Sequence, residues 1–95
     1  MYVLAMEVDL RIVDAHSLKD KRRVVKSVVE GARHRFAISA AEVGAQDSWQ
    51  RCRLGFAVVT SSAQQADEVL DDVERFVWAQ PGVEILSAER TWLDA

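Results

Sequence analysis

Hydrophobic and polar residues alternate along the first dozen positions of the chain with a period of two. Between residues 2 and 13 the even positions are apolar, whereas Glu7, Asp9 and Arg11 occupy odd positions. This alternation predicts a long β-strand with one buried face. Weaker patterns of the same kind predict three further strands, over residues 37–46, 51–60 and 83–93.

The stretch Ser17–Phe36 follows the period of a helix instead. A rotation of about 100° per residue gathers its apolar side chains on one stripe. The stripe comprises Leu18, Val25, Val28, Val29, Ala32 and Phe36. Ser17 followed by Asp20 is typical of a helix N-cap, so we expect the helix to begin there.

Capping residues predict the limits of a second helix, and a change of parity marks the strand over residues 37–46. A second helix begins at Ser62, where Gln65 completes a capping box, and the Pro-Gly pair at residues 81–82 ends it. Its outer face is rich in acidic residues. In the strand over residues 37–46, the apolar positions change from even to odd after residue 40, which predicts a bulge or a twist.

The order of elements is therefore βαββαβ, the arrangement of the ferredoxin-like fold. Right-handed crossovers place the strands in the order 4-1-3-2 in one antiparallel sheet, with both helices on one face. We expect an α+β domain that spans residues 1–95, because this length supports one core. The uncovered sheet face would carry Val3, Ala5, Glu7, Asp9 and Arg11 from the first strand and Arg51, Arg53, Gly55, Ala57 and Val59 from the third.

The uncovered face mixes apolar and charged groups, so it fits either solvent or an oligomer interface. Small open sheets also leave unpaired edges. We therefore expect a homodimer that uses this face or an edge strand.

Charge is distributed unevenly along the chain. The formal net charge is -3, yet residues 18–35 hold seven basic and two acidic residues, so that the rest of the chain is strongly acidic. A cation in the first turn of a helix opposes the macrodipole and typically loses about 0.3–1 kcal/mol. Helix stability alone therefore does not explain the cations near the helix start, which are Lys19, Lys21, Arg22 and Arg23.

An anion-binding role is one explanation for this basic helix. The hydroxyl and N–H groups of the helix start, together with a lysine, would bind an anion, and the cations further along would follow a phosphate backbone. The candidate residues are Ser17, Lys19, Arg23, Lys26 and Arg33. The alternative is a solvated basic face, paired through Glu30 with Lys26 and His34 and through the acidic second helix.

A short connection between the second and third strands holds a second set of candidates. Asp47, Trp49, Gln50 and Arg51 place an aromatic ring among an acid, an amide and a base. Trp49 is either a buried anchor of the hairpin or a contact for a partner. Trp78 falls off the apolar stripe of the second helix, which indicates a subunit contact.

Two separated motifs resemble a known family. One runs His16-Ser17-Leu18-Lys19-Asp20-Lys21-Arg22 and continues into Val25-Lys26-Ser27. The other comprises Ala41-Glu42-Val43-Gly44, Asp47, Trp49-Gln50-Arg51 and the strand Gly55-Phe56-Ala57-Val58-Val59. In these residues the chain resembles the YlxP-like family of short bacterial proteins, domain of unknown function family 503.

The resemblance implies a ferredoxin-like fold and a bacterial cytoplasmic protein. Genes of this family often lie beside those of transcription and translation factors, which suggests a role near RNA or the ribosome. The family brings no established catalytic residues.

No group of residues in the sequence indicates catalysis or metal binding. Cys52 is the single cysteine, which fits a reduced cytoplasmic compartment, and His16 and His34 lack companions that would complete a site. The first apolar run is interrupted by charges, so we expect no membrane span. Alternation places Phe56 inward, which argues against base stacking on the open sheet. We expect no enzyme activity and no cofactor.

Two function hypotheses remain. The leading one is a non-catalytic cytoplasmic module that binds structured RNA or the ribosome through its basic first helix. The alternative is a protein-interaction or homo-oligomeric module that uses the open sheet face without nucleic acid.

Overall fold

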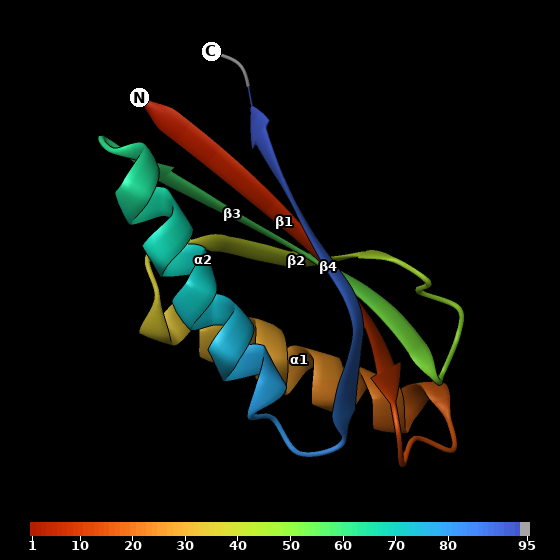
Figure 1. Ribbon diagram of the computed structural model, residues 1–95. Helices are drawn as coiled ribbons and strands as arrows, with labels where there is room; N and C mark the ends of the chain where they lie inside the picture. Colours follow the sequence, from red (N-terminus) through yellow and green to blue (C-terminus); the bar gives the residue numbers. More distant parts are fainter. Residues whose placement is uncertain (94–95) are drawn as a thin grey trace.

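The computed structural model describes residues 1–93 of the chain. Within this range the chain forms the predicted succession of strands and helices (Figure 1). The elements are β1 (Tyr2–Ile12), α1 (Leu18–Arg35), β2 (Ser39–Gly44), β3 (Arg51–Thr60), α2 (Ala63–Trp78) and β4 (Val83–Leu93). The domain expected over residues 1–95 thus includes two residues, 94 and 95, that lie outside the described part.

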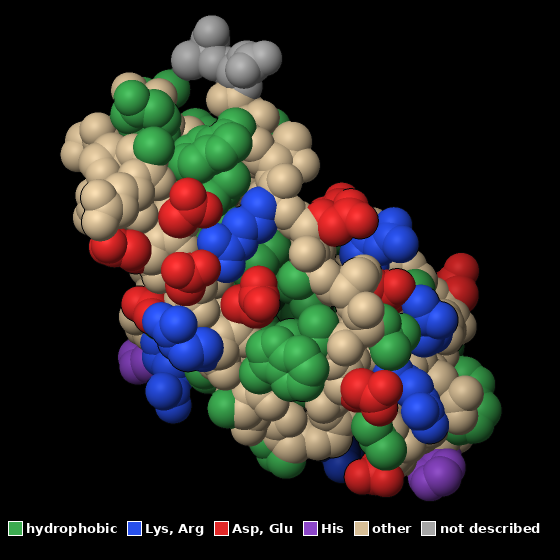
Figure 2. All heavy atoms as spheres, in the orientation of Figure 1, with side chains coloured by type: hydrophobic (Ala, Val, Ile, Leu, Met, Phe, Trp, Pro, Cys, Tyr) green, Lys and Arg blue, Asp and Glu red, His purple; other side chains and the backbone are tan. Residues whose placement is uncertain are grey.

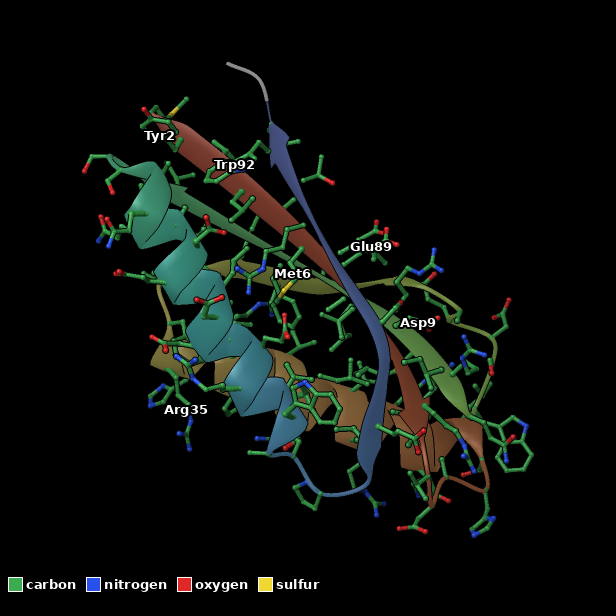
Figure 3. The ribbon with its side chains drawn as sticks, viewed as in Figure 1. Tyr2, Met6, Asp9, Arg35, Glu89 and Trp92 are labelled. Carbon is green, nitrogen blue, oxygen red and sulfur yellow. The ribbon has the colours of Figure 1, made fainter. Side chains whose placement is uncertain are left out.

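The strands form one antiparallel sheet in the order β2-β3-β1-β4, which confirms the predicted topology. Both helices cover the same face of this sheet (Figure 1), α1 near β2 and α2 against the other three strands. Met6 points from β1 toward the helices, whereas Asp9 and Glu89 point away from them (Figure 3). Neither helix is long and apolar enough to cross a membrane, as judged over residues 1–93.

The core lies between the sheet and the helices. From the strands it takes Leu4, Met6, Val8, Leu10, Ile12, Ala40, Cys52, Leu54, Phe56 and Val58. From the helices it takes Val25, Val28, Val29, Ala32, Ala66, Leu70, Val73 and Val77. Fully burying a large aliphatic or aromatic side chain of this kind stabilises the fold by about 1.5–3 kcal/mol. Phe56 is among them, as the alternation of β3 predicted.

The two helices approach each other at a glycine. A Cβ atom on Gly31 of α1 would lie 2.8 Å from Cζ of Phe76 on α2. The Phe76 ring also meets Phe36 edge-on, with 5.9 Å between ring centroids, and lies 5.0 Å from the Arg35 guanidinium. Gly31 therefore gives the space that this aromatic contact needs.

The predicted bulge is present in β2. The strand is shorter than predicted, because the Ile38 N–H bonds back to the Phe36 carbonyl (2.9 Å) in the turn after α1. Its register with β3 shifts between Glu42 and Gly44. The intervening Val43 lies over the open face, where a Cβ atom on Gly55 would be only 2.9 Å from Val43 Cγ1. The bulge therefore keeps Glu42 facing the helices.

Candidate functional site

Six cations of α1 take no part in an ion pair within residues 1–93. The ion pairs of this range use five of the twelve Lys and Arg residues, namely Arg11, Lys21, Arg51, Arg75 and Arg90. Of the remaining seven, six lie on α1 and are exposed: Lys19, Arg22, Arg23, Lys26, Arg33 and Arg35. The helix therefore presents a basic face to solvent.

The alternative of a solvated basic face agrees with the exposure of these cations, but the ion pairs that it predicted are absent from residues 1–93. Glu30 makes no ion pair within the described residues. Three carboxylates of α2 bind Arg90 of β4 instead, at 3.2 Å to Asp67, 2.8 Å to Asp71 and 3.5 Å to Glu74, and Asp72 pairs with Arg75 of the same helix. Figure 2 shows this side of the molecule, where acidic and basic side chains mingle over α2 and β4.

Arg90 is thus held by a cluster of carboxylates that the sequence pattern did not reveal. Partial burial opposes its charge, yet the hydrogen bonds and charges of the neighbouring carboxylates raise the pKa of its guanidinium above the usual value. Arg90 stands on the helix-facing side of the edge strand β4 and is therefore nearer to α2 than the cations of α1 are. Consequently the acids of α2 are not available to α1.

Ser17 forms the N-cap of α1. Its hydroxyl oxygen accepts a hydrogen bond from the Asp20 N–H (3.1 Å), and Asp20 Oδ2 accepts one from the His16 N–H (3.1 Å). This arrangement confirms the predicted helix start. The hydroxyl oxygen of Ser17 serves the helix itself, and its role as an anion ligand stays a prediction.

Arg33 lies beside the free edge of β2. Its Nη2 donates a hydrogen bond to the carbonyl oxygen of Ala40, while the side chain stays exposed. The contact occupies one carbonyl of the β2 edge, which limits pairing of another strand there. A phosphate contact by Arg33 would therefore use its remaining nitrogen donors.

Lys21 is the residue that the sequence reading misplaced. It was grouped with the exposed cations of the first turns, but only 1% of it is exposed. Its Nζ donates a 2.6 Å hydrogen bond to the Ala45 carbonyl and lies 3.0 Å from Glu42 Oε2. Ala45 itself has a positive φ of 57°, a conformation that costs about 1–2 kcal/mol for an L-residue. This buried ion pair thus joins the start of α1 to the end of β2.

The thiol of Cys52 lies next to this ion pair. Burial raises the pKa of the thiol from 9.0 to about 12, and the Glu42 carboxylate adds to the shift, while Lys21 opposes it. Such a thiol stays protonated near neutral pH and is a poor nucleophile. Within residues 1–93, no three His, Cys, Asp or Glu side chains are arranged to hold a metal ion.

The fold brings the two predicted groups of candidates together. The loop after β2 packs against the start of α1, where the Trp49 and His16 rings lie 6.4 Å apart. The Gln50 carbonyl accepts a 2.8 Å hydrogen bond from the Ile12 N–H, which anchors the other end of the loop. Trp49 remains 41% exposed. The aromatic loop and the basic helix therefore form one continuous surface.

The other residues predicted to contact a partner lie in three parts of the structure: the β2–β3 loop, the open face of the sheet and α2. Asp47 and Gln50 are exposed on the loop beside Trp49. Arg51 is bound to Asp9 at 2.7 Å on the open face of the sheet. Trp78 is 58% exposed on α2, and Figure 1 shows the end of this helix well apart from the β2–β3 loop. Trp78 therefore does not join the Trp49 surface.

The model of a protein family described as "Protein of unknown function (DUF503)" matches residues 3–90. The chain belongs to the DUF503 family. It is 37% identical over 86 residues to a Bacillus subtilis (strain 168) protein named "Uncharacterized protein YlxP", covering 90% of this chain and 94% of that protein. The predicted family is confirmed.

Solved structures similar to this DUF503 chain share its fold. A de novo designed protein with a ferredoxin fold, LFR1 1, aligns with a TM-score of 0.56 at 15% identity, covering 98% of this chain and 84% of the design. A dimeric ferredoxin-like protein from an uncultured marine organism aligns with a TM-score of 0.51 at 10% identity, covering 98% and 96%. The ferredoxin-like fold class is thereby confirmed.

The sequence of this DUF503 chain did carry a signal for the buried pair. Lys21 precedes Val25, Val28 and Ala32 by four, seven and eleven residues, which places it on the apolar stripe of α1. Glu42 likewise shares the inward parity of Ala40. Two opposite charges at inward positions of adjacent elements predict an ion pair, because buried charges are normally paired.

Removing one member of this pair should destabilise the fold strongly. Lys21→Met leaves the largely buried Glu42 carboxylate without a counter-charge, and breaking a buried pair typically costs about 3–5 kcal/mol. Because 21% of the Glu42 side chain is exposed, we expect a loss of about 3 kcal/mol. The double variant Lys21→Met/Glu42→Gln should recover about 1 kcal/mol or more, since no charge remains unpaired. Urea unfolding followed by circular dichroism measures these differences.

Lys26→Met is the matched control, because it removes an exposed cation from the same helix. Its free energy of unfolding should change by no more than about 0.5 kcal/mol. A Lys21→Met variant as stable as this control would contradict the structural role of the pair.

The Cys52 thiol should resist modification in the folded protein. Because folding raises the pKa of this thiol, the folded chain keeps a proton that the unfolded chain loses between pH 9.0 and about 12, and this group lowers stability as pH rises through that range. At pH 9 a disulfide reagent such as DTNB should react promptly in urea and only slowly without it. Equal rates in the two conditions would show that the thiol is accessible.

Proposed function

We propose that this protein is a non-catalytic cytoplasmic module that binds structured RNA, free or in the ribosome, through the exposed basic face of α1. The observation that supports the proposal is the concentration of unpaired cations there: six of the seven Lys and Arg residues outside ion pairs in residues 1–93 lie on this helix. Cations without carboxylate partners are the groups that phosphates attract. We also propose that the protein binds a second copy of itself.

The spacing of the cations suits a phosphate backbone. Lys19, Arg22, Lys26 and Arg33 follow one another by three, four and seven residues, so they lie along one side of α1. At a rise of about 1.5 Å per residue, this row is about 21 Å long. Arg23 lies next to the row at its N-terminal end. A row of this length meets several successive phosphates of one RNA strand.

Helix stability does not account for the cations at the start of α1. Lys19 lies in the first turn, where the positive end of the helix dipole disfavours a cation, and Arg22 and Arg23 follow in the second turn. Asp20 is the acidic residue of the first turn, and it is used in the cap. A lysine kept in this unfavourable place is consistent with a ligand that supplies negative charge at the helix start.

The loop beside the helix start offers a base contact next to these phosphate contacts. Trp49 and His16 form an exposed aromatic pair at the end of the cationic row. Stacking of a base on an aromatic side chain contributes about 1–3 kcal/mol and tolerates any base. RNA with an unpaired base next to a helix, as in a hairpin loop or a bulge, fits both features.

Reversing two charges on α1 should weaken RNA binding strongly. We expect Arg23→Glu/Lys26→Glu to lose affinity for a short RNA hairpin and to reduce the slope of log affinity against log salt by about 2. Fluorescence anisotropy over a range of salt concentrations measures both quantities. A matched comparison uses two single variants, Arg23→Glu and Arg75→Glu. Arg75→Glu is the control, because Arg75 is an exposed cation of α2 that is already paired with Asp72. Unchanged binding by a folded double variant would overturn the proposal.

Truncating Trp49 should weaken binding only when the RNA offers an unpaired base. Trp49→Ala is expected to weaken binding to a hairpin by about 1–3 kcal/mol, while Trp49→Phe keeps most of the affinity. Trp78→Ala removes an equally large exposed ring from α2 and should have no effect. The same titration with a blunt RNA duplex tests the base contact, since Trp49→Ala should bind the duplex like the wild type. An equal loss for both RNAs would rule out stacking.

A further inference from the structure

The sheet face opposite the helices carries side chains from all four strands. The two central strands meet there in a regular register, in which Val3 pairs with Val59, Ala5 with Ala57, Glu7 with Gly55 and Asp9 with Arg53. At one end this face is apolar, and at the other it is charged. No helix of the described chain covers either part (Figure 1).

The apolar end is exposed and hollowed. Val59 is 64% exposed and Leu93 is 53% exposed. Beside them lies a shallow depression of about 270 Å³, because its floor is made of small residues: Ala5, Ser39, Ala41, Gly55 and Ala57. An exposed apolar patch with a hollow next to it is typical of an interaction surface.

The charged end holds groups without partners in the described chain. Glu7 of β1 lies directly opposite Glu89 of β4, and like charges in that position destabilise a sheet. Neither glutamate takes part in an ion pair within residues 1–93, and Arg53 is the one unpaired Lys or Arg of this range that lies outside α1. The face thus carries unmatched negative and positive charge a short distance apart.

We propose that this face binds a second copy of the same chain about a two-fold axis that runs along the sheet between β1 and β3. Such an axis exchanges the two central strands, so that β1 of one copy faces β3 of the other. Each cross-strand pair of the single sheet then recurs across the interface, as an isologous contact requires. Val3 and Ala5 of one copy therefore meet Val59 and Ala57 of the other.

The same axis matches the charges. Arg53 of each copy lies over Asp9 of the other and within reach of its Glu7, while the missing side chain of Gly55 leaves space for that glutamate. Arg11 and Arg51 also face each other, but each is already bound to a carboxylate of its own chain, at 3.8 Å to Glu84 and 2.7 Å to Asp9. Aligned sheets pack about 30° apart, so their ends diverge and these arginines lie at the rim.

The size of the face fits this occupant. Four strands about 4.8 Å apart and a central strand of 11 residues give a plane of about 19 Å by 36 Å, or roughly 700 Å². A stable complex buries about 800 Å² per partner, and corrugated side chains expose more surface than a plane. RNA is a poor occupant, because the carboxylates of Glu7 and Glu89 repel phosphate.

This inference specifies the self-association included in the proposed function, and it is independent of RNA binding. Face-to-face packing leaves the helices on the two outer surfaces of the assembly. Both basic faces of α1 then remain accessible. Monomeric variants should therefore keep their RNA affinity per chain, which separates failure of this interface from failure of the RNA proposal.

Sedimentation equilibrium at increasing protein concentration tests the interface. We expect the wild type to dimerise and Ala57→Arg to be monomeric at concentrations where the wild type is a dimer, because the new side chain lies at the axis. Ser27→Arg, which adds the same side chain to an exposed position of α1, should still dimerise. Circular dichroism checks that each variant is folded.

A charge exchange gives the sharper test. Arg53→Glu and Asp9→Arg should each fail to dimerise alone, because like charges then lie over each other twice across the axis. An equimolar mixture of the two variants should form a heterodimer, since both contacts become attractive again. A wild type that stays monomeric at high micromolar concentration would overturn the proposal. So would folded Ala57→Arg and Arg53→Glu proteins that dimerise like the wild type, since association would then use another surface, such as the β4 edge.

Discussion

A buried ion pair beneath the start of α1 determines how the surfaces around it are arranged. Lys21 joins the Glu42 carboxylate and the Ala45 carbonyl, so one ammonium group binds the helix to the end of β2. Removing two charges from water costs as much as their attraction returns, and such a pair adds little net stability. Its effect is positional: the loop that follows β2 is held beside the helix start, where Trp49 meets His16.

The other ion pairs likewise determine which charged groups stay unpaired at the surface. Arg90 binds three carboxylates of α2, and Arg51 binds Asp9, so these acids do not pair with the cations of α1. Within residues 1–93, the Lys and Arg residues without an ion pair lie on α1, with the exception of Arg53. Arg53 lies on the opposite side of the sheet, with the unpaired Glu7 and Glu89. The two surfaces face away from each other, so the two proposed binding events would not compete.

Much of the architecture was readable from the sequence. Alternation in β1 and the apolar stripe of α1 predicted the elements, because each must bury one side. The bulge in β2 was predicted from the change of parity. Lys21 differs from the expectation, because its burial beside Glu42 separates it from the neighbouring exposed arginines, although its spacing places it on the apolar stripe. The shorter β2 was not predicted either, because a turn hydrogen bond between Phe36 and Ile38 delays the start of the strand until Ser39.

The number, type and order of the elements, the cap at Ser17 and the excess of cations on α1 could all be predicted from the sequence. These properties depend on neighbours a few positions apart along the chain. The pairing of charges became visible in the tertiary structure, where Arg53 has no ion-pair partner within residues 1–93. The position of Trp49 beside the basic helix also came from the tertiary structure. Ion pairs depend on distances of a few ångströms between segments that are far apart in the sequence, and these distances exist only once the sheet register is formed.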